Sequence, residues 1–279
     1  MPQSDGFHRR NHIKIQNLAN KFRSFRDVNY DSVTQWIDLF DRNHGELAIK
    51  ILDKVFFVDQ AKILAAYQSV HQQLVNMYDD LSHVYFVGYG YAGSSGQSML
   101  YRYKIANKLR KTPIESNFIY MSDVPNLRLV KDPVILFIDD FLGTGDEATR
   151  LWTGKKDDTA ENRPALQDIV PPNTKCYLGL IIAYETGIQK IQSETPICVL
   201  PWQILAEEDR VLTDASRKFI NEEKQLIRGY CNRTGCAPGF ATGYGDTQSM
   251  VVFEHNCPND SLPVLWYEGQ NWKGLFLRR

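Results

Sequence analysis

The stretch that decides the fold of this chain is residues 134–145, VILFIDDFLGTG. Five apolar residues run into the adjacent acidic pair Asp139 and Asp140, and two more lead to a Gly-Thr-Gly turn. Apolar residues then follow at helical spacing, namely Ala148, Leu151 and Trp152. This order predicts a buried strand, a turn and a helix. Such a corner can hold a phosphate on backbone N–H groups at the helix start, while carboxylates at the strand end accept hydrogen bonds from ribose hydroxyls.

The same order, an apolar strand, Asp-Asp, two apolar residues, a small residue, Thr and Gly, resembles the motif by which type I phosphoribosyltransferases bind 5-phosphoribosyl 1-pyrophosphate (PRPP). The resemblance implies that Asp139 and Asp140, as the catalytic pair, contact the ribose 2′ and 3′ hydroxyls. It also implies that the 5′-phosphate lies in the following loop, which consists of Gly143, Thr144, Gly145, Asp146 and Glu147.

Two residues depart from the family pattern. Gly143 stands where some members carry an acidic residue that acts as a base on the incoming nucleobase, and Glu147 stands where the loop commonly ends in Thr or Ser. Asp146 and Glu147 also place negative charge beside the expected phosphate, and a helix N-terminus offsets only about 0.3–1 kcal/mol per charge. The alternative is that the acidic pair ends a core strand and caps the next helix, with ordinary turn chemistry after it.

A second glycine-rich loop follows the apolar strand expected at residues 83–88. Residues 88–93 read GYGYAG, which has the G-x-G-x-x-G spacing of a dinucleotide site. Such a site also needs an acidic residue about 20 positions on, at the end of the second strand. We expect that strand at residues 117–121, so Asp123 comes too late and Glu115 precedes the strand. The dinucleotide reading is therefore the weaker alternative.

Under the phosphoribosyltransferase resemblance, this second loop holds the pyrophosphate of PRPP. The binding residues would be Gly93, Ser94, Ser95 and Gly96, through backbone N–H groups and hydroxyls. A tight strand-to-helix turn without a ligand is the structural alternative. The loop contains no Lys or Arg, so neutralising the diphosphate would depend on a divalent cation, which we expect to be Mg²⁺ bound with PRPP.

Composition bounds the function. The chain has 279 residues, 43% of them hydrophobic, and a formal net charge of −1. There is no bulk attraction to nucleic acid, so nucleic-acid binding would need a local basic patch and stays open. The apolar runs reach about five or six residues against the roughly 20 that cross a bilayer, and the sequence MPQSDGFHRRNH lacks the apolar core of a signal peptide. We expect a cytoplasmic protein without a membrane partner.

Five cysteines make an odd count, which favours reduced thiols. Cys231 and Cys236 are followed by His255 and Cys257, which are residue types that zinc accepts. The spacings are loose, and we predict no bound metal among them.

The remaining pattern indicates an α/β protein with a parallel sheet. Residues 1–28 read as a polar tail with one short helix, and apolar spacing predicts three amphipathic helices over residues 33–40, 47–55 and 63–74. Buried strands are expected at 176–183 and 197–200, and a polar helix at 209–230. We expect a helical N-terminal cap (1–80), a phosphoribosyltransferase-like core (81–205) and a loop-rich C-terminal extension packed on the core (206–279).

The C-terminal sequence carries a second resemblance. Gly-Tyr-Gly from residue 243, a strand, Asn-x-Pro-Asn from 256, Leu-Pro at 262 and Trp266 follow in order. With the helical N-terminal third, this resembles the phosphoribosyltransferase-like effector family of bacterial conflict (anti-phage) systems. Three functions stay open: transfer of phosphoribosyl from PRPP to a base or an unusual acceptor, a nucleotide-sensing module without chemistry, and a toxin-like effector controlled by a partner ATPase or reverse transcriptase.

Overall fold

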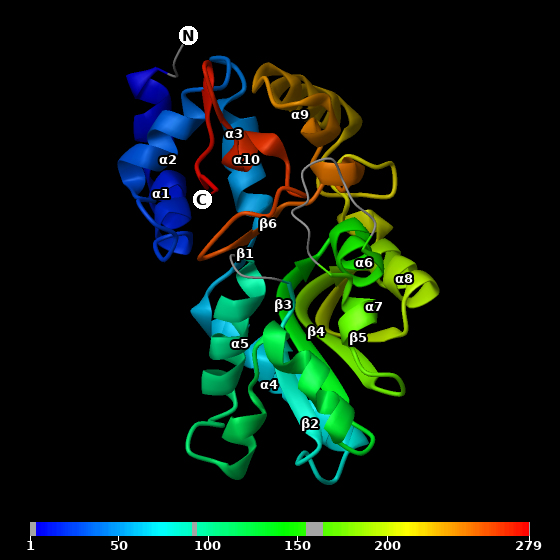
Figure 1. Cartoon of the computed structure of the whole chain (residues 1–279). Coiled ribbons are helices and arrows are strands. Elements are labelled where there is room, and N and C mark those ends of the chain that lie inside the picture. Colours follow the sequence, from blue (N-terminus) through cyan, green and yellow to red (C-terminus); the bar gives the residue numbers. More distant parts are fainter. Residues whose placement is uncertain (1–3, 91–93, 155–163, 279) are drawn as a thin grey trace. The chain divides into compact units, whose positions relative to one another are not determined.

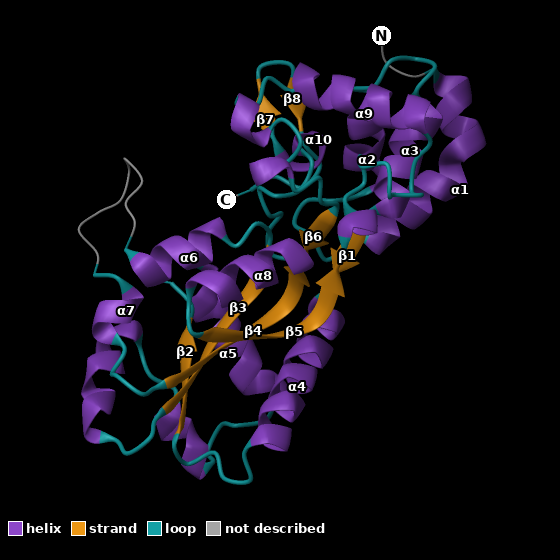
Figure 2. Ribbon diagram, turned by 90° about the vertical axis from the view of Figure 1, so that its right-hand side faces the viewer, coloured by secondary structure: helices purple, strands orange, loops and turns teal. Residues whose placement is uncertain are grey.

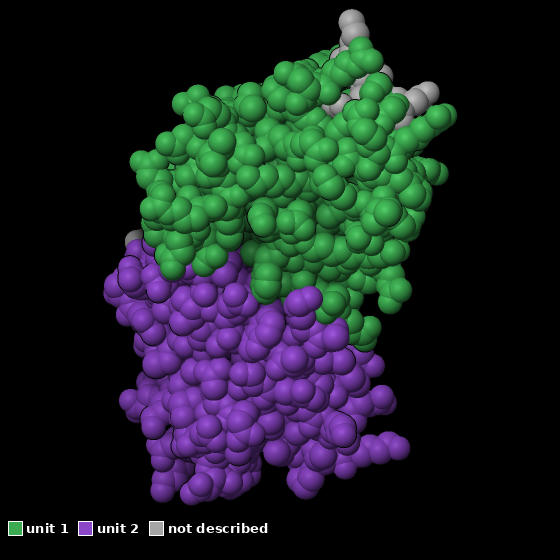
Figure 3. All heavy atoms as spheres, turned by 180° about the vertical axis from the view of Figure 1, so that it is seen from behind, with its two compact units in different colours: residues 1–60, 207–279 green, residues 61–206 purple. Residues whose placement is uncertain are grey.

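The computed structural model describes residues 4–90, 94–154 and 164–278. The chain divides into two compact units, one formed by residues 1–60 and 207–279 and the other by residues 61–206 (Figure 3). The contacts therefore group residues 61–80 with the sheet and bring the two ends of the chain into one unit. The three domains expected from the sequence stay a prediction.

The unit of residues 61–206 is built on four parallel strands in the order β2-β3-β4-β5 (Figures 1 and 2). They are β2 Val84–Gly88, β3 Val134–Leu142, β4 Lys175–Tyr184 and β5 Ile197–Leu205. These strands are continuous apolar runs, as is typical of a parallel sheet whose two faces are both covered by helices. The expected parallel α/β sheet is confirmed, and β5 continues five residues beyond the short strand predicted to end at Leu200.

Helices lie on both faces of this sheet. On one face Tyr67 and Tyr103 contact each other, and Tyr103 also packs on Phe86 of β2. The opposite face packs against Trp152 and Ile191 in a separate core cluster. The helices of this unit are α4 Gln60–Met77, α5 Ser95–Ala106, α6 Asp146–Thr153, α7 Leu166–Ile169 and α8 Glu185–Glu194, with the 3₁₀ helices η1 Pro113–Asn117 and η2 Met121–Leu129.

The direction in which the chain moves across the sheet reverses after β2. After β2 the chain reaches Phe118, which forms a single parallel bridge with Phe86, and Ile119 N–H donates to the Phe86 carbonyl at 3.1 Å. Since β3 pairs with the other side of β2, the chain lies first on one side of β2 and then on the other. Open α/β sheets bind ligands at the carboxyl ends of strands at such a switch point.

The strand predicted at residues 117–121 was wrong in extent, because only this bridge forms among those residues. The 3₁₀ helix η2 begins at Met121, and the Asp123 carboxylate accepts a hydrogen bond from Tyr120 N–H at 3.2 Å. That bond turns the chain away from the sheet.

The unit of residues 1–60 and 207–279 packs around aromatic side chains, with Phe40 in ring contact with Trp36, Tyr230 and Trp272. Its strands β1 Phe56–Val58 and β6 Val251–Phe253 are parallel, and β7 Glu268–Gly269 pairs antiparallel with β8 Trp272–Lys273. Its helices are α1 Asp5–Lys21, α2 Tyr30–Ile37, α3 Gly45–Lys54, α9 Asn221–Arg233 and α10 Pro263–Trp266, with 3₁₀ helices η3 Glu207–Asp209, η4 Pro238–Phe240 and η5 Tyr244–Asp246.

Two predictions for this unit need correction. The N-terminal segment is not a tail with a short helix: α1 has 17 residues and buries Ile15 and Leu18. The polar helix expected from residue 209 begins only at Asn221. Within the described residues, no helix combines the length and apolar character that crossing a bilayer requires.

Candidate functional site

Asp139 and Asp140 lie at the carboxyl end of β3, at the switch point. The strand continues through the pair to Leu142, whereas the sequence predicted that the pair is the end of the strand. Asp140 N–H donates to Asp139 Oδ1 at 3.0 Å, and the Tyr67 hydroxyl donates to the Asp139 carbonyl at 3.1 Å. Both side chains are half-buried. The N-cap residue of α6 is Gly145, and the first N–H of the helix donates to Thr144 Oγ1 at 3.2 Å, so Thr144 has the capping role that the alternative gave to the acidic pair.

Ser95, at the start of the helix that follows β2, forms a hydrogen bond with the Asp139 carboxylate on the neighbouring β3. Its hydroxyl donates to Asp139 Oδ1 at 2.5 Å, and it is the first residue of α5, the helix that follows β2. The sequence predicted Ser95 as a pyrophosphate ligand and missed this contact, because only the parallel pairing of β2 with β3 brings the two residues together. This hydrogen bond between Ser95 and Asp139 brings the predicted pyrophosphate loop next to the acidic pair.

The environment of Asp139 favours its protonated form. Burial and the neighbouring Asp140 charge raise the pKa of Asp139 well above its usual range, although the hydrogen bonds from Ser95 and from Asp140 N–H partly oppose that rise. Ligand hydroxyls or a cation would supply the favourable interactions that the ionised pair lacks here.

The loop of Gly143, Thr144, Gly145, Asp146 and Glu147 forms the turn into α6. Gly145 has φ 81°, a left-handed conformation that a glycine adopts without strain, and a Cβ there would lie 2.9 Å from the Gly187 carbonyl oxygen. Asp146 N–H donates to Thr144 Oγ1 at 3.2 Å. The loop is thus held tightly against α8.

The charge of Asp146 is compensated from α8. Lys190 Nζ donates to Asp146 Oδ1. Burial alone raises the pKa of Asp146, but the hydrogen bonds from Lys190 and Thr144 and the Lys190 charge bring it below its usual value overall. Sequence reasoning counted Asp146 as uncompensated negative charge beside the expected phosphate, and it missed Lys190, which lies 44 residues further along the chain. Glu147 is exposed.

The loop after β2 brings Ser94, Ser95 and Gly96 to the start of α5, and Gly93 lies outside the described residues. Ser94 is the N-cap residue, and its hydroxyl donates to the Tyr89 carbonyl at 3.2 Å. A Cβ at Gly96 would lie 2.2 Å from that carbonyl oxygen, so only glycine permits this approach of α5 to the strand end.

The dinucleotide alternative lacks its acidic residue. Asp123 caps η2, and Glu115 Oε2 accepts a hydrogen bond from Lys111 N–H at 2.6 Å while its Oε1 lies 3.7 Å from Lys104 Nζ. Both candidate carboxylates therefore have local structural roles.

Asp139 and Asp140 are residues that could hold Mg²⁺ together with a ligand. Mg²⁺ is usually bound by one or two protein carboxylates together with substrate phosphates, which Asp139 and Asp140 match. Residues 4–90, 94–154 and 164–278 contain no group of three or more His, Cys, Asp or Glu side chains that could hold a metal by itself.

Burial raises the pKa of the Cys231 and Cys257 thiols to about 12.

Comparison with known proteins gives one family. The family model PRTase-CE matches residues 33–278, which is most of the chain. Neither the search of curated proteins nor the search of solved structures gave a match.

Proposed function

The chain belongs to the PRTase-CE family of phosphoribosyltransferase-like conflict effectors, and from that premise we propose that it binds PRPP or a related ribose phosphate at the carboxyl ends of β2 and β3. The observation that carries the proposal is the acidic pair at the switch point, with one carboxylate held by Ser95 from the neighbouring α5. Asp139 and Asp140 accept hydrogen bonds from the ribose hydroxyls, as the resemblance implies.

The two helix starts beside the pair bind the phosphates in this proposal. The loop of residues 143–147 receives the 5′-phosphate at the N-terminus of α6, where Lys190 neutralises Asp146. Ser94, Ser95 and Gly96 receive the pyrophosphate at the N-terminus of α5, and the same role is proposed for Gly93. Mg²⁺, held by Asp139 and Asp140 together with the ligand, would neutralise the diphosphate and make it a better leaving group.

Transfer is the enzymatic form of this function. A nucleophile of the acceptor forms a bond to C1 of the ribose, pyrophosphate leaves with the electrons of the broken C1–O bond, and a base takes the acceptor's proton. Gly143 supplies no carboxylate for that last step. This favours a second candidate, a nucleotide-sensing module that binds PRPP without turnover. Release of pyrophosphate from PRPP, followed by ³¹P NMR, separates the two.

The proposed effector role is assigned to the unit of residues 1–60 and 207–279. We propose that the helical cap expected at residues 1–80, of which α1 to α3 lie in this unit, docks a partner ATPase or reverse transcriptase in an anti-phage system. The family assignment supports this role. Co-purification of the chain with the product of a neighbouring ATPase or reverse transcriptase gene tests it.

Thermal shift with PRPP, with and without Mg²⁺, tests the binding proposal, and NAD, ATP and dNTPs serve as comparison ligands. A ligand at about 100 times its dissociation constant stabilises a protein by about 2.7 kcal/mol, which is several degrees at this size. We expect that shift with PRPP and Mg²⁺. No shift with any ribose-containing ligand at millimolar concentration would contradict the proposal.

A further inference from the structure

We propose that the outer face of α5, together with residues 113–120, binds single-stranded nucleic acid. Residues 101–120, which run from the outer face of α5 through residues 113–120, carry five Lys and Arg against one Glu, a local net charge of +4 in a chain of net charge −1. A basic patch of this kind is the electrostatic mark of a nucleic-acid surface. The proposal does not rest on PRPP binding, because it concerns a different surface.

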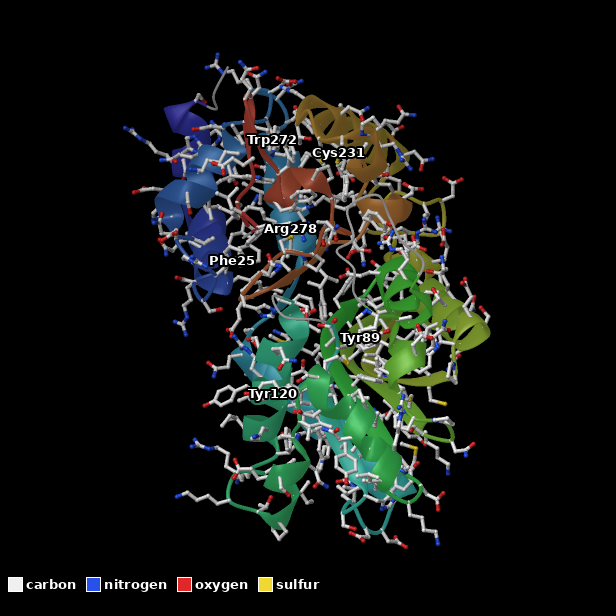
Figure 4. The ribbon with its side chains drawn as sticks, viewed as in Figure 1. Phe25, Tyr89, Tyr120, Cys231, Trp272 and Arg278 are labelled. Carbon is white, nitrogen blue, oxygen red and sulfur yellow. The ribbon has the colours of Figure 1, made fainter. Side chains whose placement is uncertain are left out.

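Exposed aromatic rings lie within this basic surface. Tyr101 of α5 is 59% exposed and Tyr120 is 69% exposed, and Tyr120 is labelled in Figure 4. Ile105, one helical turn after Tyr101, is also exposed, at 37%. Exposed tyrosines among basic residues offer planar surfaces on which unstacked bases can lie, which is how proteins hold single strands without reading sequence.

Two contacts of Lys104 hold residues 113–120 beside α5. Lys104 Nζ lies 4.4 Å from the centre of the Phe118 ring and 3.7 Å from Glu115 Oε1. Phe118 and Tyr120 both have an extended backbone, with φ/ψ of −83°/99° and −85°/160°, and from the alternation of side chains along an extended segment we infer that they point to the same side. Tyr120 is therefore on the α5 side.

The two tyrosines lie at nearly the same level along α5. The segment at Phe118 is parallel to β2, and α5 returns in the opposite direction. Two extended residues advance about 6.6 Å, which equals roughly four residues of helix. Starting from the contact of Lys104 with Phe118, Tyr120 reaches the level of Leu100 and Tyr101. We call these two exposed tyrosines the aromatic platform, because each offers a ring on which a base can stack.

The basic residues and the candidate site lie beyond opposite ends of this platform. Lys108, Arg110 and Lys111 are exposed after the C-terminus of α5, where they can contact phosphates. Ser95, which binds Asp139, begins α5 about 9 Å before Tyr101 at the helical rise. A strand bound by these lysines and tyrosines would point toward Ser95. We favour a nucleic acid over an anionic lipid surface, because bases can stack on two exposed tyrosine rings, whereas lipid headgroups offer no planar partner.

The test is fluorescence anisotropy of the full chain with labelled oligo(dT) and oligo(rU) of about 12 nucleotides, a length that covers one typical single-strand site. A duplex of the same length and anionic vesicles are the comparison ligands. We expect Tyr101→Ala and Tyr120→Ala each to weaken single-strand binding by about 5- to 150-fold, the range for one stacked base. Tyr101→Phe and Tyr120→Phe should bind as the wild type does, since they keep the ring.

The charges are tested by salt dependence. Replacing Lys108, Arg110 and Lys111 together by Gln should lower the slope of log K against log salt by about 2, because each phosphate contact contributes about 0.7 for single strands. Arg23→Gln with Arg26→Gln, exposed positions in the other unit, is the control and should leave affinity unchanged.

Absence of single-strand binding at low salt would overturn the proposal. Binding unaffected by both Tyr→Ala changes would do so too, as would preference for the duplex or for vesicles. The DNA and RNA arms identify which strand is preferred, and either preference supports it. Asp139→Asn should keep single-strand affinity, so failure of PRPP binding and failure of this surface are separate results.

Discussion

The ionised Asp139 carboxylate is proposed to bind the ligand, but it lowers the unfolding free energy of the ligand-free protein. Burial and the Asp140 charge raise its pKa above the unfolded value. Between the unfolded pKa, about 3.9, and the folded pKa, the folded state binds more protons than the unfolded state, so this group makes stability fall as pH rises. We therefore predict that ligand-free Asp139→Asn melts at or above the wild-type temperature at pH 7.5.

The pH dependence gives the measurement. Melting temperatures between pH 5 and pH 8 should fall less steeply for Asp139→Asn than for the wild type, since the variant lacks the titrating carboxyl. A variant that melts lower than the wild type, with the same pH dependence, would mean that the carboxylate stabilises the fold.

The turn into α6 depends on the left-handed backbone conformation of Gly145. Its φ of 81° and the 2.9 Å between an added Cβ and the Gly187 carbonyl oxygen predict that Gly145→Ala loses about 1–2 kcal/mol or more of unfolding free energy. Gly229, inside α9, is the matched control because an added Cβ meets nothing within 4 Å. Gly229→Ala should be neutral or gain up to about 1 kcal/mol. Urea unfolding compares the two, and an equal effect at both positions would contradict the account.

At this scale the sequence predicted the acidic pair but not its partners. Two adjacent carboxylates after an apolar strand are visible in the sequence order alone. Ser95 and Lys190 each reach their carboxylate across 44 residues, and only the strand pairing and the packing of α8 against α6 bring them there.

At the scale of elements, α8 prepares the start of α6 for a phosphate. Lys190→Met removes the cation beside Asp146. Because the pair is about one-third exposed, unfolding free energy should change by no more than about 1 kcal/mol. PRPP affinity should fall by about tenfold, since an uncompensated carboxylate then lies near the phosphate.

Lys175→Met is the control for that change. Lys175 is exposed at the first residue of β4, at the amino edge of the sheet. Calorimetric titration with PRPP and Mg²⁺ should give the wild-type affinity for this variant. Equal affinity for both variants would show that Lys190 has no role in phosphate binding.

Apolar strands were the most predictable elements. The strands after residues 83, 134 and 176 were expected from continuous apolar runs, and the sheet has them. The segment at Phe118 reads as a similar strand, but the Asp123 carboxylate and the start of η2 end it after one bridge. α1 was underestimated because its exposed face is strongly polar, so its few buried residues gave a weak pattern.

At the scale of the whole molecule, the candidate site belongs to one unit. All of its described residues fall within residues 61–206, while Trp272 lies in the core of the other unit. Trp272 is 2% exposed, contacts the Phe40 ring at 5.3 Å and donates to the Val264 carbonyl at 2.9 Å. Trp272→Ala should cost about 3–5 kcal/mol, or roughly 10 °C at this size.

The PRPP affinity of Trp272→Ala, measured below its melting temperature, should equal that of the wild type. A large loss of affinity in the folded variant would mean that the two units do not act separately. This division was not predicted from the sequence, because the unit that contains Trp272 combines residues from both ends of the chain.

The ribose phosphate site at the acidic pair is tested by calorimetric titration of PRPP with Mg²⁺ into the wild type, Asp139→Asn, Asp140→Asn and Asp168→Asn. Asp168 is an exposed aspartate of α7 in the same unit and serves as the matched control. Loss of a hydrogen bond to a charged group costs about 1.5–3 kcal/mol. The two site variants should therefore bind about 10- to 150-fold more weakly, and Asp168→Asn should bind as the wild type does. Equal affinity in all four proteins, or no binding to the wild type, would contradict the assignment of a ribose phosphate site to the acidic pair.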